Sequence, residues 1–482
     1  MTGGDLRIRT CRGSRCPWCP PLRPKVAGVM SHEIDRPRPH LHFSVSAGWT
    51  NDPHGIVHVG GEYHLFFQHN PVGNSWAPAC HWGHAISPDL IRWTELETAL
   101  SPEPGEVGCW SGSCVVDDEG PVILYTSIVG DDWSRGRVAL ARPAGDDLTR
   151  WERRPEAAVI DGPPENERII AFRDPFVWRA GAGWIALVGA GLDGFGGCAL
   201  QYSSVDLQDW TYDGVLASKP AAERDPEWTG TAWECPQLFR MGTSWVLLVS
   251  VWENDVTHHV AYAIGDYDGR HFHPRHWRRF SYGQLYATTT FLDEHGRRSI
   301  MSWMRELDDV APQNASWGSA MSLPHVLSLI GDRLVVSYHP ALEAYLPEVR
   351  RVPAIRQNTA SVDAGDVGPV WRLTAHVAVG SVGRLDINVT GQGVQLWRLG
   401  LDGQDRVLRI HRPDRGLMVE MPMDGPDGTL DVLADNDILE VIWSGGSGLA
   451  ATRIPIGRNA RLDITTSGGL TMDEIVVRQP VP

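Results

Sequence analysis

A short motif of the form Asp-Leu-x-x-Trp occurs three times in this chain at nearly constant spacing. It occupies residues 89–93, 147–151 and 206–210, so successive copies lie 58 and 59 residues apart. A weaker copy at residues 268–272 follows 62 residues later. Internal repeats of this size are typical of propellers and solenoids, in which each repeat is one supersecondary unit. The spacing therefore predicts an architecture of equivalent units placed side by side.

The segments between these motifs have the composition of β-strands. Residues 63–67, 121–125, 184–188 and 245–249 are short β-rich runs, and Gly, Asp and Asn separate such runs at hairpin-like intervals. Helical periodicity is scarce before about residue 340. Four-stranded units of roughly 60 residues would fill residues 36–345 five times. We therefore expect a five-bladed β-propeller over this range.

The chain changes character after a short helix-like run at residues 340–346. From residue 355 to residue 482, β-rich segments alternate with Gly and Asp turns, and the Asp-Leu-x-x-Trp motif does not recur. About 125 residues of short strands suit a β-sandwich. The predicted fold class is all-β, with a five-bladed β-propeller followed by a C-terminal β-sandwich.

Composition excludes several classes of partner. The formal net charge of −16 argues against nucleic-acid binding, which needs clustered Lys and Arg, and no apolar stretch approaches the length of a membrane span. Tryptophan, at 21 residues, outnumbers both Tyr and Phe at 10 each, and its flat face suits stacking against sugar rings. We expect a neutral small-molecule sugar as substrate, with no nucleic acid and no membrane.

The first 35 residues are unusual. They contain several Arg and Pro residues and Cys11, Cys16 and Cys19, but no apolar core of a secretory signal. We expect a disordered tail, or an upstream start that precedes a true Met30, and hence a cytoplasmic protein. The three cysteines have irregular spacing and no evident fourth ligand, so no metal site is expected there.

Three acidic residues stand in short segments rich in aromatic residues, Pro and Gly. Asp174 follows Asp52 by 122 residues and Glu234 follows Asp174 by 60, so the first interval is about twice the second. Equivalent inner strands of a propeller surround one axial channel. The three carboxylates are therefore predicted to converge on a single site, and the same register places Ser111 in the second blade there as well.

Converging carboxylates are the catalytic groups that usually cleave a glycosidic bond. A retaining mechanism needs a nucleophilic carboxylate and a protonated acid about 5–5.5 Å apart. The apolar neighbours of Glu234 suit an acid with a raised pKa, and Asn51 can donate a hydrogen bond to an ionised Asp52. Asp174 is expected to hold sugar hydroxyls, with Arg173 keeping it ionised.

These segments resemble the motifs of glycoside hydrolase family 32, the family of invertases, levanases and inulinases. The resemblance implies a five-bladed propeller with a β-sandwich, and retaining hydrolysis of β-D-fructofuranosides. It extends from residue 42 to about residue 330. It rests on Trp49-Thr50-Asn51-Asp52-Pro53-His54-Gly55, residues 63–71, His81-Trp82-Gly83-His84, Trp110-Ser111-Gly112-Ser113, Arg173-Asp174-Pro175, Trp233-Glu234-Cys235-Pro236 and Leu285-Tyr286-Ala287.

The resemblance also implies roles for individual residues. Asp52 would be the nucleophile, Glu234 the acid/base, and Asp174 the stabiliser of the transition state. No metal or cofactor is implied. The fructose pocket would be lined by Asn51, Gln68, Trp76, Trp110, Ser111 and Arg173, with Tyr286 and Trp303 as weaker matches.

Among the departures from the family pattern, two bear on the charge near the catalytic residues. His54 stands where the family has Asn, and Gln237 stands where an acidic residue is frequent. Both substitutions are expected to change the charge near the site.

The function that we expect is release of terminal β-D-fructofuranosyl residues from sucrose or short fructo-oligosaccharides. A fructosyltransferase or a levan or inulin exo-hydrolase would use the same catalytic groups, so these alternatives stay open. A five-bladed pentosidase acting on arabinose or xylose, and a non-catalytic carbohydrate-binding propeller, fit the motifs less well. The sequence leaves the oligomeric state open, with a homodimer as one option.

Overall fold

A computed structural model describes residues 36–480 except 146–147, 309–310, 313–314, 357, 444–447, 456 and 458, and the side chains of residues 154–157. The predicted tail at residues 1–35, with its three cysteines, lies outside the described residues. Within the described part of the chain, no helix is long and apolar enough to cross a membrane.

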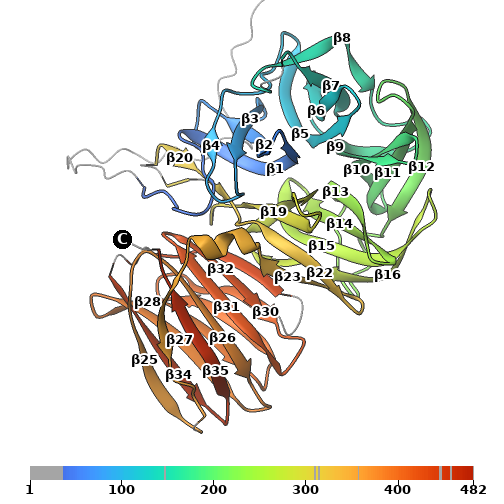
Figure 1. The fold of residues 1–482 in the computed structure, drawn as a ribbon. Coiled ribbons are helices and arrows are strands. Elements are labelled where there is room, and N and C mark those ends of the chain that lie inside the picture. The colour runs from blue at the N-terminus through green and yellow to red at the C-terminus, as the bar shows by residue number, and fades with distance from the viewer. Residues whose placement is uncertain are drawn as a thin grey trace, which may run out of the picture. The chain divides into compact units, whose positions relative to one another are not determined.

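Five antiparallel sheets of the described chain follow one another in sequence, as the repeat predicts (Figure 1). The first contains β1 (Gly48–Val59), β2 (Glu62–Asn70), β3 (His81–Ser87) and β4 (Thr94–Glu95). The second contains β5 (Glu106–Asp117), β6 (Gly120–Val129), β7 (Arg137–Pro143) and β8 (Trp151–Ile160). The third contains β9 (Ile169–Ala180), β10 (Gly183–Leu192), β11 (Gly196–Ser204) and β12 (Trp210–Ser218). The fourth contains β13 (Ala232–Met241), β14 (Ser244–Glu253), β15 (Val256–Tyr267) and β16 (Phe272–Arg279). The fifth contains β18 (Leu285–Leu292), β19 (Arg298–Met304), β21 (Ala320–Met321), β22 (His325–Ile330) and β23 (Arg333–Tyr338).

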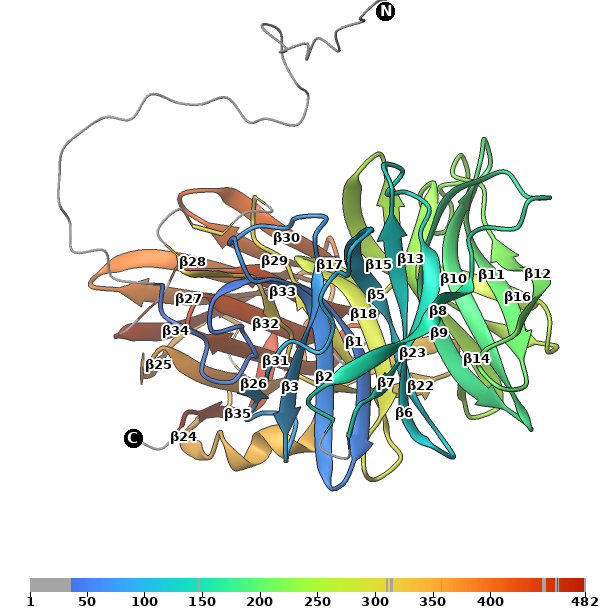
Figure 2. The same cartoon turned by 90° about the horizontal axis from the view of Figure 1, so that it is seen from above.

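The five sheets form a closed ring. The first strand of each blade contacts the first strand of the next, from β1 through β5, β9, β13 and β18 and back to β1. Figure 1 shows β1, β5, β9 and β13 nearest the centre, and Figure 2 shows β1, β2 and β3 side by side in the first blade. A short strand, β20 (Trp317–Gly318), pairs in parallel with the start of β1 and joins the end of the ring to its beginning. The propeller prediction is confirmed.

The repeated Asp-Leu-x-x-Trp motif forms the turn between the third and fourth strands of a blade. Leu90, Leu148 and Leu207 have φ values of 68°, 55° and 66°, and each accepts a hydrogen bond from the indole three residues later at 2.9–3.1 Å. The carboxylates of Asp89 and Asp206 accept backbone N–H groups within their own turns. The motif therefore forms the same turn in successive blades, which explains its constant spacing.

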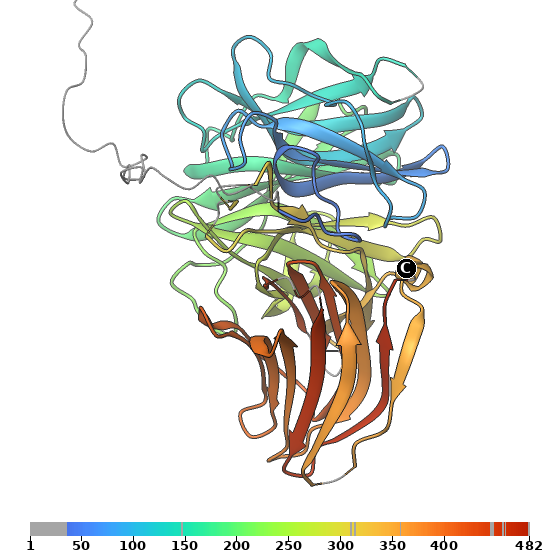
Figure 3. The same ribbon diagram turned by 90° about the vertical axis from the view of Figure 1, so that its left-hand side faces the viewer.

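The second part of the fold is a β-sandwich, whose two layers of strands are seen in orange and red in Figure 3. One sheet has the order β17-β33-β32-β31-β26-β35-β24 and the other β25-β34-β27-β28-β29-β30. Two strands of the first sheet, β17 (Ser281–Gly283) and β24 (Glu348–Val352), lie before residue 355 in the chain. The helix-like run is a 3₁₀ helix, η1 (Pro340–Ala344). The remaining strands are β25 (Ala360–Val367), β26 (Val370–Ala378), β27 (Arg384–Gly391), β28 (Val394–Asp402), β29 (Val407–Arg412), β30 (Gly416–Pro422), β31 (Asp427–Asp435), β32 (Ile438–Trp443), β33 (Gly448–Arg453), β34 (Ala460–Ser467) and β35 (Thr471–Arg478).

A buried network of charges joins the propeller to the sandwich. Glu306, which is 4% exposed, accepts hydrogen bonds from Arg36 at 2.7 Å and from Arg453 at 3.1 Å. Both guanidinium groups also pair with Asp437. Buried charges are tolerated only when they are paired in this way. The network therefore fixes the fifth blade against the sandwich.

Candidate active site

The first strand of every blade contains an irregularity at the same place. The strand register shifts between Asn51 and Pro53, between Trp110 and Gly112, and between Glu234 and Gln237, with equivalent shifts in β9 and β18. The residues at these bulges have positive φ values in four blades: Asp52 at 35°, Asp174 at 63°, Cys235 at 45° and Ala287 at 45°. A β-bulge redirects side chains and is common next to active sites.

The bulges bring side chains from different blades together. The Ser111 hydroxyl on β5 donates to Asp52 on β1 at 2.7 Å, and the Cys235 N–H on β13 donates to Asp174 on β9 at 3.1 Å. Glu234 on β13 accepts from Tyr286 on β18 at 2.6 Å. The Thr126 hydroxyl links the two sets, because it donates to the Ser111 carbonyl at 2.9 Å and accepts the Asp174 N–H. Each of the five first strands therefore contributes to one connected group, which contains the three predicted carboxylates.

Asp52 is surrounded by hydrogen-bond donors. The Asn51 amide donates to Asp52 Oδ1 at 3.0 Å, while Ser111 and the Gln68 amide, at 3.3 Å, donate to Oδ2. Burial and the nearby Glu234 carboxylate raise the pKa of Asp52 to about 6, against the opposing effect of Asn51 and Ser111. Asp52 is therefore ionised and acceptor-only above about pH 6, as a nucleophile requires.

Glu234 has polar partners rather than the apolar surroundings expected from its sequence neighbours. Its Oε1 accepts from Arg173 Nε at 2.9 Å and its Oε2 from the Tyr286 hydroxyl. The Arg173 guanidinium is buried, lies 5.2 Å from the Trp252 ring centroid, and donates to the Ser134 carbonyl at 3.3 Å. Arg173 therefore orients Glu234 directly.

Asp174 differs from the sequence expectation. Burial and the Glu234 carboxylate raise its pKa, and the attraction of Arg173 opposes this without overcoming it. Arg173 acts on Asp174 in the expected direction, but it does not offset burial and Glu234, and its side-chain hydrogen bond goes to Glu234. Three carboxylates in one buried site repel one another, and this favours retention of a proton among them.

The predicted sugar-binding residues fall into two groups. Asn51, Gln68 and Ser111 form a chain of hydrogen bonds to Asp52, with Gln68 donating to Ser111 at 2.5 Å. The predicted aromatic residues make ring contacts with other aromatic side chains. Trp76 is 43% exposed and lies edge-on to Trp110 at 5.7 Å, whereas Trp303 is buried between Trp49 and Tyr286.

The two departures from the family motifs do not add charge. His54 is fully buried against Trp82, with ring centroids 4.0 Å apart, and burial lowers its pKa to about 3. It is therefore neutral at physiological pH. Gln237 accepts hydrogen bonds from the backbone and hydroxyl of Thr290 at 3.2 and 3.1 Å, which ties the fourth blade to the fifth.

Comparison with known proteins agrees with this geometry. The model of the glycosyl hydrolases family 32 N-terminal domain matches residues 42–338. The chain belongs to glycoside hydrolase family 32. It is a glycoside hydrolase of the β-fructofuranosidase type.

Individual relatives of this family-32 protein differ in how much of their length it covers. A sucrose-6-phosphate hydrolase of Escherichia coli is 29% identical over 90% of this chain and 93% of its own length. A cell-wall β-fructofuranosidase of Zea mays is 34% identical over 69% of this chain but only 58% of its own. The structure of a β-fructofuranosidase of Bombyx mori matches with a TM-score of 0.77 and 25% identity, covering 92% of this chain and 94% of that one.

The family-32 motifs did not indicate every residue that shapes the site. The Thr126 hydroxyl accepts the Asp174 N–H at 2.7 Å, and the Ser319 hydroxyl accepts the indole N–H of Trp303. Ser319 in turn donates its backbone N–H to Glu306 at 2.7 Å. Neither Thr126 nor Ser319 stands in a recognisable motif, and only the register of the blades could have suggested Thr126.

Replacement of Ser111 by Ala tests the electrostatics of this family-32 site. Loss of a hydrogen bond to the ionised form raises the pKa of Asp52 further, so a higher pH is needed to ionise it. In a plot of kcat/KM for sucrose against pH, the activity should fall on the acidic side with a midpoint near pH 6 in the wild type. In Ser111→Ala this midpoint should rise by about one pH unit. Ser113→Ala is the matched control, because that hydroxyl lies on the same strand and, within the described part of the chain, accepts the Val177 N–H at 3.1 Å rather than contacting Asp52. An unchanged limb in Ser111→Ala would contradict the assignment.

Proposed function

We propose that the protein hydrolyses terminal β-D-fructofuranosyl bonds of sucrose and short fructo-oligosaccharides with retention of configuration. The observation that carries this proposal is the grouping of Asp52, Asp174 and Glu234 with Arg173 at one point of the ring. Retaining hydrolysis needs a carboxylate nucleophile and an acid that face each other across the bond to be broken. The structure of the Bombyx mori relative solved in complex with sucrose supports a substrate of this size.

In the first step the Asp52 carboxylate attacks C2 of the fructosyl unit while the bond from C2 to the glycosidic oxygen breaks. Glu234 gives its proton to that oxygen, and the leaving sugar departs as an alcohol. Arg173 and Tyr286 each hold one oxygen of Glu234, so the carboxyl group keeps its orientation during the transfer. A covalent fructosyl ester on Asp52 results.

In the second step water attacks C2, Glu234 accepts a proton from that water, and the bond between C2 and Asp52 breaks. Fructose leaves and both carboxyl groups return to their starting states. Asp174 stands beside the reacting centre, where it can accept hydrogen bonds from fructose hydroxyls. Such contacts accelerate the reaction when they strengthen as positive charge develops on the ring.

A panel of sucrose, sucrose 6-phosphate, 1-kestose, inulin and levan tests this proposal through the rate of fructose release. Sucrose and 1-kestose should be cleaved with the highest kcat/KM, and the fructose first released should have the β configuration. Release of the α anomer would contradict the retaining mechanism. Accumulation of trisaccharides at high sucrose concentration would identify the protein as a transferase instead.

A further inference from the structure

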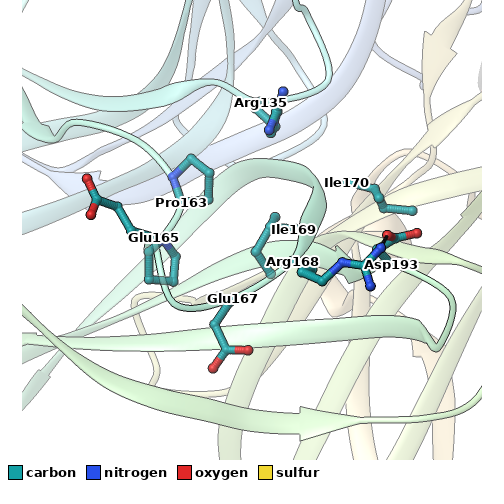
Figure 4. A pocket seen from close by; sticks show the side chains of 9 residues that line it. Arg135, Pro163, Glu165, Glu167, Arg168, Ile169, Ile170 and Asp193 are labelled. Atoms are coloured by element: carbon teal, nitrogen blue, oxygen red, sulfur yellow. Dashed lines mark hydrogen bonds and ion pairs between the residues drawn. The ribbon is translucent and has the colours of Figure 1, made fainter.

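A surface cavity of about 410 Å³ lies between loops of the second and third blades. It is bordered by the β6–β7 loop, the β8–β9 loop and the β10–β11 loop. Figure 4 shows Arg168 next to Asp193 and Ile170, with Arg135 on a neighbouring segment. The polar lining consists of Arg135, Glu165, Glu167, Arg168 and Asp193.

The cavity lies at the end of the third blade that is nearer to Asp174. All three loops lie at the end of the blades where β9 begins, and β9 runs from Ile169 at the cavity to Asp174 at the site. Asp174 lies four positions after Ile170, which corresponds to roughly 13 Å of strand. That distance is too long for the fructosyl unit that is cleaved, but it suits later units of the same oligosaccharide.

A direct connection links the cavity wall to the catalytic group. The Ser134 carbonyl accepts the Phe172 N–H at 2.9 Å and Arg173 Nη1 at 3.3 Å. Arg135, the next residue, lines the cavity and pairs with Phe172 in a β-bridge. The loop that borders the cavity is therefore held against the residue that orients Glu234.

The chemistry of the cavity fits a neutral sugar. Carboxylates and guanidinium groups recognise hydroxyls, and two aromatic side chains on the bordering loops, Trp133 and Phe195, are 43% and 44% exposed. Exposed aromatic rings beside polar groups are typical of a binding surface. We propose that this cavity binds the sugar units of a neutral fructo-oligosaccharide that come after the first unit beyond the scissile bond.

A phosphorylated sugar fits this cavity less well. The lining carries two guanidinium groups and three carboxylates, so its formal charge is negative. Arg168 is paired with Asp193, and Arg135 with Asp132 at 2.6 Å. Both cations therefore already have acidic partners, and a phosphate group would meet uncompensated negative charge.

The inference rests on the proposed function and is tested with a double variant, Arg168→Ala with Asp193→Ala. The matched control is Arg179→Ala with Asp118→Ala, an exposed ion pair of the same two blades at the opposite end of β9. Exposed ion pairs contribute little to stability, so both variants should fold. The measurement is kcat and KM for sucrose, 1-kestose and nystose.

The cavity variant should raise KM for 1-kestose and nystose about tenfold. Its kcat and its KM for sucrose should stay unchanged, because uniform binding affects KM alone. The control should match the wild type on all three sugars. Equal KM changes for sucrose and nystose, or none in the cavity variant, would overturn the inference.

Failure of the proposed function gives a different result, because the wild type would then release no fructose from any of the three sugars. Calorimetric titration with nystose tests the cavity in that case. Weaker binding to the cavity variant than to the control variant supports the cavity, and equal binding to both overturns it.

Discussion

Replacement of Asp52 by Asn is expected to lower kcat for sucrose by about four orders of magnitude or more, with the fold intact. A neutral amide cannot form the fructosyl ester, so the first step of the reaction is lost. The backbone should tolerate the change because Asn accepts positive φ, here 35°, nearly as well as Asp. The measurement is steady-state fructose release, with circular dichroism to show that the fold is retained. Turnover within about tenfold of the wild type would contradict the role of Asp52 as nucleophile.

Glu234→Gln distinguishes the acid from the nucleophile. This variant cannot protonate the leaving oxygen, so hydrolysis of sucrose should fall as severely as in Asp52→Asn. An aryl fructoside such as p-nitrophenyl β-D-fructofuranoside has a leaving group that departs without a proton. Formation of the fructosyl-enzyme from it should be retained in Glu234→Gln and lost in Asp52→Asn, which a burst of nitrophenol would reveal. A burst in Asp52→Asn and none in Glu234→Gln would instead identify Glu234 as the nucleophile and Asp52 as the acid.

Glu306→Ala is expected to have the largest effect on stability of any single change in the region that joins propeller and sandwich. It leaves the buried Arg36 and Arg453 without one of their carboxylate partners and Ser319 N–H without an acceptor. Breaking a buried charge network in this way lowers the free energy of unfolding by about 3–5 kcal/mol. Urea denaturation would measure the difference.

The control for this prediction is Asp308→Ala, which removes an exposed ion pair with Arg415 at 3.0 Å across the same two parts of the fold. Its effect should be below about 1 kcal/mol. A similar decrease in the free energy of unfolding in the two variants would show that the buried network stabilises the fold no more than an exposed ion pair does.

The sequence predicted the architecture well because its repeated element is local. The Asp-Leu-x-x-Trp motif determines its own turn through hydrogen bonds within five residues, so its spacing reports the size of a blade directly. The position of Ser111 beside Asp52 followed from the same register and is confirmed by their hydrogen bond.

The electrostatics of the site could not be read in the same way. Asp174 is the bulge residue of β9, whereas in β13 the bulge residue is Cys235 and Glu234 comes one position earlier. This offset places Glu234 against Arg173, although the spacing from Asp174 to Glu234 looks regular. Such partners depend on side-chain directions around the channel, and a pattern along the chain does not contain them. The Glu306 network was missed for the same reason, since Glu306 lies 270 residues from Arg36 and 147 residues from Arg453 in the sequence.

The bulge that recurs in all five first strands bears on how enzymes of this architecture diverge. Ser111 and Ala287 occupy the places that hold Asp52 and Asp174 in other blades, without supplying an acid themselves. A point mutation at such a place would put a new functional group at the axis with no change in loop length or backbone course. New reactions can therefore evolve on this scaffold one residue at a time, while the strands that support them remain the same.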